Sequence, residues 1–309
     1  MKKYNYLFGP VLSRRFGKSL GVDLVPLKTC TMDCIFCQLG RTKKKTLIRK
    51  EYVPVELVTA EIADWLASGD VADCITLSGS GEPTLHSRFG DVIHFIHKHT
   101  TIPVLLLTNS SLLSLAPVRR AAARADIVKV SLSAWDQESF NKINKTFSGI
   151  TFERYIAGLQ AFRTEFKGQL VMEVFLVKGL NSDQESAKKI AELAALIRPD
   201  LIQFNTVVRP PAERSVLPVT SAIMKDLSKL FKPHAQLIPT MSPAKGKAVK
   251  ATGEEILALL RRHPCTITQV AKAFDMPKPD AQNRIEQLLR NGKIIVSRMK
   301  DKIYYVERT

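Results

Sequence analysis

Six short apolar segments, separated by amphipathic stretches, constrain the fold of this 309-residue sequence more than any other feature. They are SLGVDLVPL (19–27), DCITLSG (73–79), VLLLTNS (104–110), DIVKVSLSA (126–134), LVMEVFLVK (170–178) and LIQFNTVV (201–208). Stretches with helical spacing, such as VELVTAEIADWLASG and DQESAKKIAELAALI, lie between them. Strands that alternate with helices in this way are typical of a parallel sheet covered by helices. Six such units fit either a partial or complete α/β barrel or a doubly wound sheet.

Two of these segments have one apolar face and one polar face, which helps to choose between the folds. In 126–134, Lys129, Ser131 and Ser133 alternate with apolar residues, and in 201–208 Asn205 lies opposite Phe204. An apolar face under helices and a polar face on the other side favour a barrel with a functional interior. We therefore predict an α/β fold, with a partial (β/α)6 barrel over residues 1–235.

The sequence changes character after this region. Residues 236–252 are rich in Pro, Gly, Lys and small residues, which is typical of a linker. Residues 253–309 contain three short helical patterns followed by a hairpin-like segment, IIVSRMKDKIYYVE. This order predicts a small C-terminal winged helix-turn-helix domain. Its outward polar and basic side chains are expected to be Gln282, Asn283, Arg284, Glu286, Arg298, Lys300 and Lys302.

Three cysteines follow the first apolar segment directly, in KTCTMDCIFCQLG (28–40), with the spacing C-x3-C-x2-C. In parallel barrels the loops at the carboxyl ends of strands build the active site, so this position suits chemistry. Clustered cysteines without other pairs indicate a metal or redox site in a reducing compartment, and we expect a cytoplasmic protein. The two remaining cysteines, Cys74 and Cys265, are expected to be buried small hydrophobic residues.

The cysteine spacing admits three interpretations. A structural zinc site needs four ligands, and one of His86, His94, His97 or His99 could supply the fourth. The cysteines could also simply be packed without a metal. An iron–sulfur cluster with three thiolate ligands would leave one iron open to something other than the protein. A reaction needs such an open position.

The loop resembles the cluster motif of the radical S-adenosylmethionine (SAM) enzymes, with the aromatic Phe36 immediately before the last cysteine. The resemblance implies that Cys30, Cys34 and Cys37 hold a [4Fe–4S] cluster whose fourth iron is chelated by SAM. It implies that one electron, supplied by a donor such as flavodoxin or ferredoxin, cleaves SAM to methionine and a 5′-deoxyadenosyl radical. The radical would abstract a hydrogen atom from the substrate, and Phe36 would lie near the adenine.

A second motif, SGSGEPTL (78–85), is similar to the glycine-glycine-glutamate-proline segment of the same family. The resemblance implies that the segment Gly79, Ser80, Gly81 and Glu82 contacts the SAM amino group through its backbone. Glycines without side chains allow a backbone to approach a ligand closely. Ser80 stands where the family often has glycine, a mild departure if backbone groups bind the ligand.

Polar residues on later strands are further candidates for SAM binding. They are Asn109, Lys129, Ser131, Ser133 and Asn205. The resemblance places SAM contacts at the end of the third strand, and lysine and serine side chains suit a carboxylate and ribose hydroxyls. The alternative for Lys129 is an interior salt bridge to Glu173. No catalytic residue beyond the cofactor contacts is predicted.

The net charge of +17 is concentrated at the two ends of the chain. Residues 1–50 hold 12 Lys or Arg against two Asp, and residues 250–309 hold 12 against seven Asp or Glu. Such concentration favours a polyanionic partner, and RTKKKTLIRK (41–50) and Arg209 could contact phosphates or another anionic group. A lysine-rich, solvated turn is the alternative for 41–50. No stretch approaches the 18 apolar residues of a membrane span.

Two further stretches, GPVLSRRFGKSLGVDL (9–24) and FNTVVRPPAE (204–213), resemble an iron–sulfur oxidoreductase subgroup near the wyosine tRNA-modification synthases. Three alternative functions are consistent with these observations. The first is a radical SAM enzyme acting on a nucleic acid, contacted by the basic N-terminal region and the winged helix. The second is a radical SAM enzyme acting on a protein, peptide or small metabolite. The third is a non-enzymatic iron–sulfur or zinc regulator that binds DNA.

Overall fold

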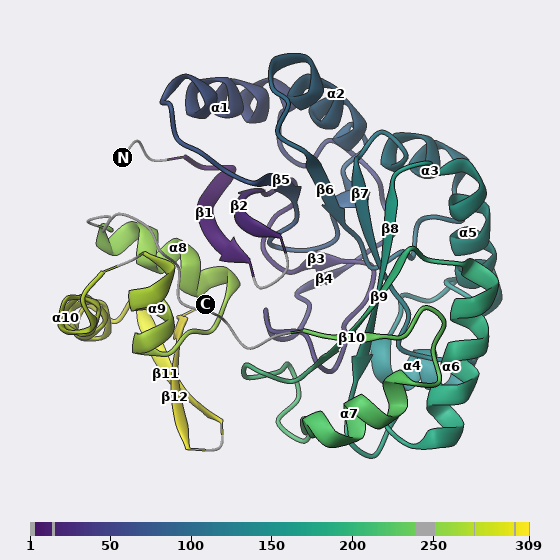
Figure 1. Ribbon diagram of the computed structural model, residues 1–309. Coiled ribbons are helices and arrows are strands. Elements are labelled where there is room, and N and C mark those ends of the chain that lie inside the picture. The colour runs from purple at the N-terminus through teal and green to yellow at the C-terminus, as the bar shows by residue number, and fades with distance from the viewer. Residues whose placement is uncertain (1–3, 14–15, 239–250, 275, 300, 309) are drawn as a thin grey trace.

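The computed structural model describes residues 4–13, 16–238, 251–274, 276–299 and 301–308. Its main feature is an eight-stranded sheet with the order β1-β2-β5-β6-β7-β8-β9-β10 (Figure 1). The strands are β1 (Leu7–Ser13), β2 (Gly17–Val22), β5 (Cys74–Leu77), β6 (Val104–Leu107), β7 (Ile127–Ser131), β8 (Gln169–Leu176), β9 (Leu201–Thr206) and β10 (Gln236–Leu237). β1 pairs antiparallel with β2, and every other neighbouring pair is parallel.

Helices cover the outer side of this curved sheet, and the cysteine loop lies on its inner side (Figure 1). The helices are α1 (Val55–Ala67), α2 (Phe89–His99), α3 (Ala116–Ala122), α4 (Gln137–Asn144), α5 (Phe152–Glu165), α6 (Gln184–Ile197) and α7 (Ser221–Ser228), with a 3-10 turn at Pro83–Leu85. The predicted α/β architecture of the partial-barrel type is confirmed. Six parallel strands fall within or close to the six apolar segments, since consecutive strand–helix units bury their apolar faces against each other.

The first strand and the last strand of the sheet were not among the expected segments. β1 contains Gly9 and Pro10, residues that are depleted in strands, and it pairs with β2 through an irregular register between Phe8 and Val11. The first apolar segment is also shorter as a strand than predicted. β2 ends at Val22, and the chain then turns toward the cysteine loop through a hydrogen bond from Thr29 N to Pro26 O at 3.0 Å.

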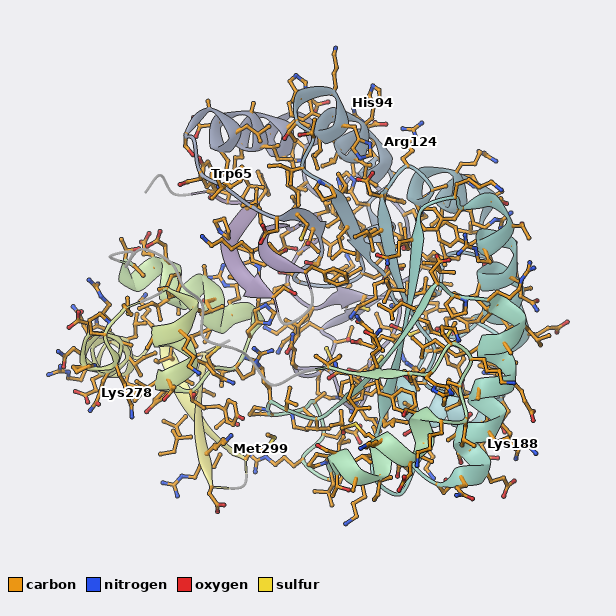
Figure 2. The ribbon with its side chains drawn as sticks, viewed as in Figure 1. Trp65, His94, Arg124, Lys188, Lys278 and Met299 are labelled. Carbon is orange, nitrogen blue, oxygen red and sulfur yellow. The ribbon has the colours of Figure 1, made fainter. Side chains whose placement is uncertain are left out.

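The core between sheet and helices explains why the sequence pattern was informative. Trp65 of α1, Phe89 of α2 and Phe162 of α5 are at most 1% exposed and belong to one cluster with the outward residues of the strands. Burying one large apolar side chain stabilises the folded state by about 1.5–3 kcal/mol. The opposite faces of the helices are polar, and Figure 2 shows Lys188 on α6 pointing away from the sheet.

Residues 251–308, called here the C-terminal unit, contain three helices and a hairpin beside β1 (Figure 1). The elements are α8 (Gly253–Arg262), α9 (Ile267–Ala273), α10 (Lys278–Arg290), β11 (Ile294–Met299) and β12 (Lys302–Glu307). Ile256, Leu260 and Ile285 form its own apolar core. The interpretation as a winged helix-turn-helix domain and the domain limits stay predictions. Lys300 and residues 239–250 of the predicted linker lie outside the described residues.

A buried ion pair joins the C-terminal unit to the sheet. Arg262, the last residue of α8, donates from Nη2 at 2.8 Å and from Nε at 3.1 Å to Asp23 Oδ2. The guanidinium also lies over the ring of Phe8 on β1, at 4.4 Å from its centroid. Tyr304 of β12 donates a hydrogen bond to the Val208 carbonyl at 3.0 Å. These contacts bring α8 and α9 against the inner side of the barrel.

Candidate functional site

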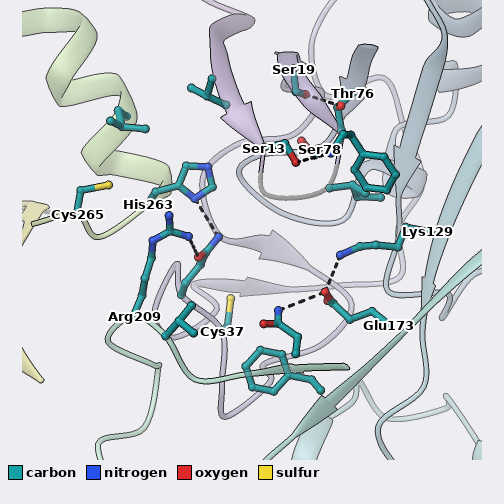
Figure 3. Close-up of a pocket in the computed structure, with 18 of the residues that line it drawn as sticks. Ser13, Ser19, Cys37, Thr76, Ser78, Lys129, Glu173, Arg209, His263 and Cys265 are labelled. Atoms are coloured by element: carbon teal, nitrogen blue, oxygen red, sulfur yellow. Dashed lines mark hydrogen bonds and ion pairs between the residues drawn. The ribbon is translucent and has the colours of Figure 1, made fainter. Parts of the chain in front are cut away.

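A cavity of about 350 Å³ lies inside the curved sheet, within the usual size range of small-molecule sites (Figure 3). Inward side chains of β2 and β5 to β9 form much of its wall. The cysteine loop contributes Phe36, Cys37 and Gln38, and the C-terminal unit contributes residues of α8, α9 and the segment between them. Three parts of the chain that are far apart in sequence therefore meet around one space.

The three cysteines lie on the loop that follows β2. Cys30 ends β3 (Thr29–Cys30), a two-residue strand paired with β4 (Lys44–Lys45), and Cys37 N donates to Cys34 O at 3.0 Å. Two side-chain amides point at the sulfurs. Asn109 Nδ2 donates to Cys30 Sγ at 3.4 Å, and Asn144 Nδ2 donates to Cys34 Sγ at 3.3 Å. Hydrogen bonds of this kind orient thiolate ligands and tune the metal that they bind.

Burial changes the acidity of the three thiols. Burial raises the pKa of Cys30 to about 12, raises that of Cys34 well above its ordinary value, and raises that of Cys37. Thiols with such pKa values become thiolates when a metal replaces the proton. In the described part of the chain, no three His, Cys, Asp or Glu side chains surround a single ion position. A cluster does not require this arrangement, because each cysteine binds a different iron, whereas zinc needs four ligands at one point.

Three of the four histidines proposed as a fourth zinc ligand contact other residues, and the fourth lies on the outer side of the sheet. His86 Nε2 donates to the Val53 carbonyl at 2.8 Å. On α2, His97 pairs with Asp126 at 2.9 Å and His99 stacks on Phe95. His94 lies on the same helix, on the outer side of the sheet (Figure 2).

Phe36 lies on the cavity wall and stacks on Phe175 of β8, with ring centroids 4.0 Å apart and an interplanar angle of 9°. The pair forms a flat apolar surface beside Cys37. Aromatic rings favour offset stacking, so a third planar ring could stack on this pair. The geometry is compatible with the predicted contact of Phe36 to an adenine.

The segment Gly79–Glu82 is held by protein contacts, and these explain its glycines. A side chain at Gly81 would lie 1.8 Å from the Thr29 carbonyl, and Gly79 adopts a φ of +125° with Asp23 alongside. Ser80 donates from its backbone N to Asp23 Oδ1 at 3.1 Å, and its hydroxyl also donates to Asp23. The close approach that the glycines permit is therefore to the cysteine loop and to Asp23. Ser80 has a hydrogen-bonding role that glycine could not fill.

Glu82 and Asn109 connect this segment to the end of β6. Glu82 is 2% exposed and accepts hydrogen bonds from Thr84 N, Thr84 Oγ1, Thr108 Oγ1 and Asn109 N at 2.6 to 3.1 Å. Burial raises its pKa, although these hydrogen bonds oppose the rise. Asn109 also donates to Thr31 Oγ1 at 2.8 Å. The predicted residues Gly79 to Glu82 and Asn109 thus form one layer behind the cysteine loop.

The predicted polar residues Lys129 and Asn205 line the cavity itself (Figure 3). Lys129 Nζ lies 2.8 Å from Glu173 Oε1, and Asn205 Nδ2 donates to the same oxygen at 3.2 Å. The interior salt bridge considered as the alternative for Lys129 is therefore present. The two serines have other surroundings. Ser133 Oγ accepts a hydrogen bond from Phe175 N at 3.0 Å, and neither Ser131 nor Ser133 lines the cavity.

Sequence reasoning missed several residues of this site. Asp23, Gln38, Asn144, Phe175 and His263 all contact the predicted residues or line the cavity. The aromatic and polar residues of the expected strands carried a weak signal, since Phe175 lies on the same face as Glu173. Asn144 and His263 carried none, because one ends α4, the other directly follows α8, and both reach the cysteine loop from distant parts of the sequence.

Comparisons with known proteins identify the family. Residues 24–194 match the model of the radical SAM superfamily. A UPF0026 protein of Helicobacter pylori (strain J99) is 33% identical over 303 residues, covering 97% of this chain and 96% of the relative. A GTPase Obg of Brachyspira hyodysenteriae is 34% identical over 296 residues, which cover 94% of this chain; the chain spans only 44% of that protein. A probable dual-specificity RNA methyltransferase RlmN of Clostridium acetobutylicum is 28% identical over 217 residues, covering 66% of this chain and 59% of that protein.

Solved structures show the same fold. The structure of TYW1 with a lysine-pyruvate adduct bound has a TM-score of 0.53 and 19% identity, and covers 74% of this chain and 76% of its own. Members of the radical SAM superfamily are enzymes that bind SAM and a [4Fe–4S] cluster. None of the helices in the described ranges is long and apolar enough to cross a membrane. The chain therefore belongs to the radical SAM superfamily and, within it, to the UPF0026 proteins.

Proposed function

We propose that this protein cleaves SAM reductively at a [4Fe–4S] cluster held by Cys30, Cys34 and Cys37, and that it modifies a nucleic acid. The observation that carries the proposal is the three-cysteine loop, placed at the carboxyl end of β2 with Cys37 at the cavity, in a chain of the radical SAM superfamily. When bound, the cluster and SAM supply a 5′-deoxyadenosyl radical that abstracts a hydrogen atom. The residues of this chain bind, orient and shield the reactants.

Three groups of residues would share this work. The amides of Asn109 and Asn144 orient two of the three cysteines through their hydrogen bonds to sulfur. The segment Gly79–Glu82, fixed by Asp23 and by the hydrogen bonds of Glu82, would contact the SAM amino group through its backbone. The stacked pair of Phe36 and Phe175 offers an apolar face for the adenine. The cluster fits this loop better than zinc does, because His86, His97 and His99 contact other residues and His94 lies on the outer side of the sheet.

The polar wall of the cavity has a positioning role in this proposal. Glu173 Oε1 receives both Lys129 Nζ and Asn205 Nδ2, so the carboxylate holds two donors on the inner face of the sheet. In this proposal Lys129 and Asn205 would contact SAM or the substrate from the cavity wall. Ser131 and Ser133 do not line the cavity. We assign Ser133 a structural role, because its hydroxyl accepts the hydrogen bond from Phe175 N of β8.

The nucleic-acid substrate is supported by the charge of the chain and by the RNA methyltransferase among its relatives. Within 41–50, Lys43 and Lys44 are exposed, whereas Arg41 pairs with Asp33 at 2.9 Å and Arg49 donates to the Thr84 carbonyl at 3.0 Å. Part of this basic segment is therefore structural and part is available to phosphates. On the C-terminal unit, Gln282 and Asn283 of α10 are exposed, as nucleic-acid contact would require.

The reaction is tested by anaerobic reconstitution. Iron and sulfide are measured, followed by dithionite-driven formation of 5′-deoxyadenosine, for the wild type, Cys34→Ala and the matched control Cys74→Ala. Cys74 is buried outside the loop, so its variant should keep both cluster and activity. Cys34→Ala should lose both. Loss of the cluster with SAM cleavage retained would overturn the mechanism, and zinc as the sole bound metal would favour a regulator.

The substrate class is tested by RNA binding at several salt concentrations. A lysine that contacts phosphate contributes about one unit to the slope of log affinity against log salt. Lys44→Gln should lower the slope by about that amount, whereas Lys188→Gln, on the outer face of α6, should not. Binding that does not respond to salt would contradict a nucleic-acid substrate. Transfer of label from a deuterated protein, peptide or metabolite into 5′-deoxyadenosine would establish the second function instead.

A further inference from the structure

Arg209 is a cationic side chain on the cavity wall, and it has no anionic partner among the residues that the structure describes. It follows β9 by three residues and contributes to the cavity wall (Figure 3). In the described part of the chain its guanidinium makes one hydrogen bond, from Nη1 to Gln38 Oε1 at 3.0 Å, and no ion pair. Its Nε is buried without a hydrogen-bond partner. A guanidinium has five N–H donors, and a buried donor that is left without a hydrogen-bond partner is costly.

Gln38 connects this arginine to the C-terminal unit. Because Gln38 Oε1 accepts from Arg209, its Nε2 is the donor toward His263 Nδ1, at 2.9 Å. The Nδ1 of His263 therefore accepts this hydrogen bond. Cys265 lies on the same side of the cavity, where burial raises its pKa to about 11 against the opposing positive charge of Arg209. The surroundings of the guanidinium thus come from the barrel on one side and from the C-terminal unit on the other.

The described residues that line the cavity include two cationic side chains, Lys129 and Arg209, and one anionic side chain, Glu173. Lys129 and Glu173 also line the cavity, and they pair with each other at 2.8 Å. Among the described lining residues, Arg209 is the charged side chain that no opposite charge meets. A planar guanidinium beside amide and imidazole groups is suited to an anion that accepts several hydrogen bonds, which means a carboxylate or a phosphate.

We infer that Arg209, Gln38 and His263 form an anion site that binds a carboxylate or phosphate group of the substrate, with the C-terminal unit as one wall. That the anion belongs to a substrate rests on the proposed function. SAM also carries a carboxylate, but Arg209 and His263 both lie outside residues 24–194, the part that matches the superfamily model. The shared cofactor is expected to be bound chiefly by the shared region, with Asn205 as the one SAM candidate beyond it, whereas two of the three residues of the anion site lie beyond it.

The test uses reconstituted full-length protein and inorganic phosphate or acetate as the probe, at constant ionic strength. Binding of each anion is followed by NMR line broadening, with and without saturating SAM. The variants are Arg209→Gln and the control Arg214→Gln, which changes an exposed arginine of the same loop. A charge-assisted hydrogen bond contributes about 1.5–3 kcal/mol, so Arg209→Gln should weaken binding of at least one anion about 10- to 100-fold. Arg214→Gln should bind as the wild type does.

Two results would overturn the inference. One is equal binding of both anions by the wild type and Arg209→Gln. The other is displacement of the bound anion by SAM, together with weaker SAM binding by Arg209→Gln in calorimetry, which would assign the site to the cofactor. Because Arg209→Gln loses the hydrogen bond to Gln38 but no ion pair among the described residues, it should unfold in urea at a midpoint only slightly below that of Arg214→Gln. A loss as large as that expected for a broken buried ion pair would indicate a structural arginine.

The anion measurement is independent of radical chemistry. If the reconstituted protein binds phosphate through Arg209 but forms no 5′-deoxyadenosine, the anion site stands and the proposed reaction fails. If it cleaves SAM but Arg209→Gln binds both anions as tightly as the wild type, the reaction stands and the anion site fails.

Discussion

Replacing Arg262 by methionine should destabilise the protein strongly, because the change leaves a buried carboxylate without its counter-charge. The side chains of Arg262 and Asp23 are 8% and 7% exposed, and two nitrogens of the guanidinium contact Asp23 Oδ2 at 2.8 and 3.1 Å. Removing one partner of a buried ion pair costs about 3–5 kcal/mol. Ser80 still donates to Asp23 in the variant, which favours the lower end, whereas the lost contact with Phe8 adds about 0.5–1 kcal/mol. We expect a loss of about 3–4 kcal/mol.

A double-mutant cycle measured by urea unfolding tests this value. Asp23→Asn combined with Arg262→Met removes both charges, so the double variant should be more stable than Arg262→Met alone. The matched control is Arg261→Met. Arg261 pairs with Glu307 at 2.6 Å inside the C-terminal unit but is 43% exposed, so its loss should cost less than about 1 kcal/mol. Equal losses for Arg261→Met and Arg262→Met, or a double variant no more stable than Arg262→Met, would refute the reasoning.

Three further predictions concern single residues of the barrel. Asn144→Ala removes the hydrogen bond to Cys34. The reduction potential of the cluster, measured in an EPR-monitored titration, should become more negative, and the protein should bind iron about 10- to 100-fold more weakly. An unchanged potential would contradict this role of Asn144. Burial lowers the pKa of His86, so stability is lost as the pH falls through its unfolded pKa of about 6.5. His86→Gln should therefore reduce the pH slope of unfolding below pH 7 by up to about 1.4 kcal/mol per unit, and an unchanged slope would show that His86 does not titrate there. Lys129→Met should cost about 3 kcal/mol in urea unfolding, and adding Glu173→Gln should recover part of the loss if the pair is structural.

The sequence was sufficient for the parts of the fold that local pattern determines. Six parallel strands and their helices follow from apolar periodicity, and the cysteine loop follows from its place after the first strand. The edge strand β1 could not be predicted in this way, because Gly9 and Pro10 read as a turn and pairing with β2 supplies the hydrogen bonds that keep it extended. Pairing between segments is a tertiary property that a local pattern does not contain.

The candidate site was predictable in its residue types but less so in its contacts. The segment Gly79–Glu82 was expected to need glycine for a ligand, yet the backbone that approaches Gly81 is the carbonyl of Thr29. Asp23 and Arg262 meet across 239 positions of sequence. Neither residue type nor spacing indicates such a partner, because the contact depends on where the C-terminal unit packs. Long-range polar contacts are for this reason the part of the site that only the structure supplies.

The C-terminal unit has two faces with different expected roles, and this decides how a nucleic-acid partner should be tested. Arg262 and His263 face the barrel, whereas Gln282 and Asn283 are exposed on α10. Deleting the whole unit would leave Asp23 without its counter-charge and open the cavity wall, so lost activity would say nothing about RNA. Gln282→Ala with Asn283→Ala avoids this problem: we expect RNA binding to weaken while SAM binding and urea unfolding stay as in the wild type. Unchanged RNA binding would exclude the exposed face of α10 as the RNA contact.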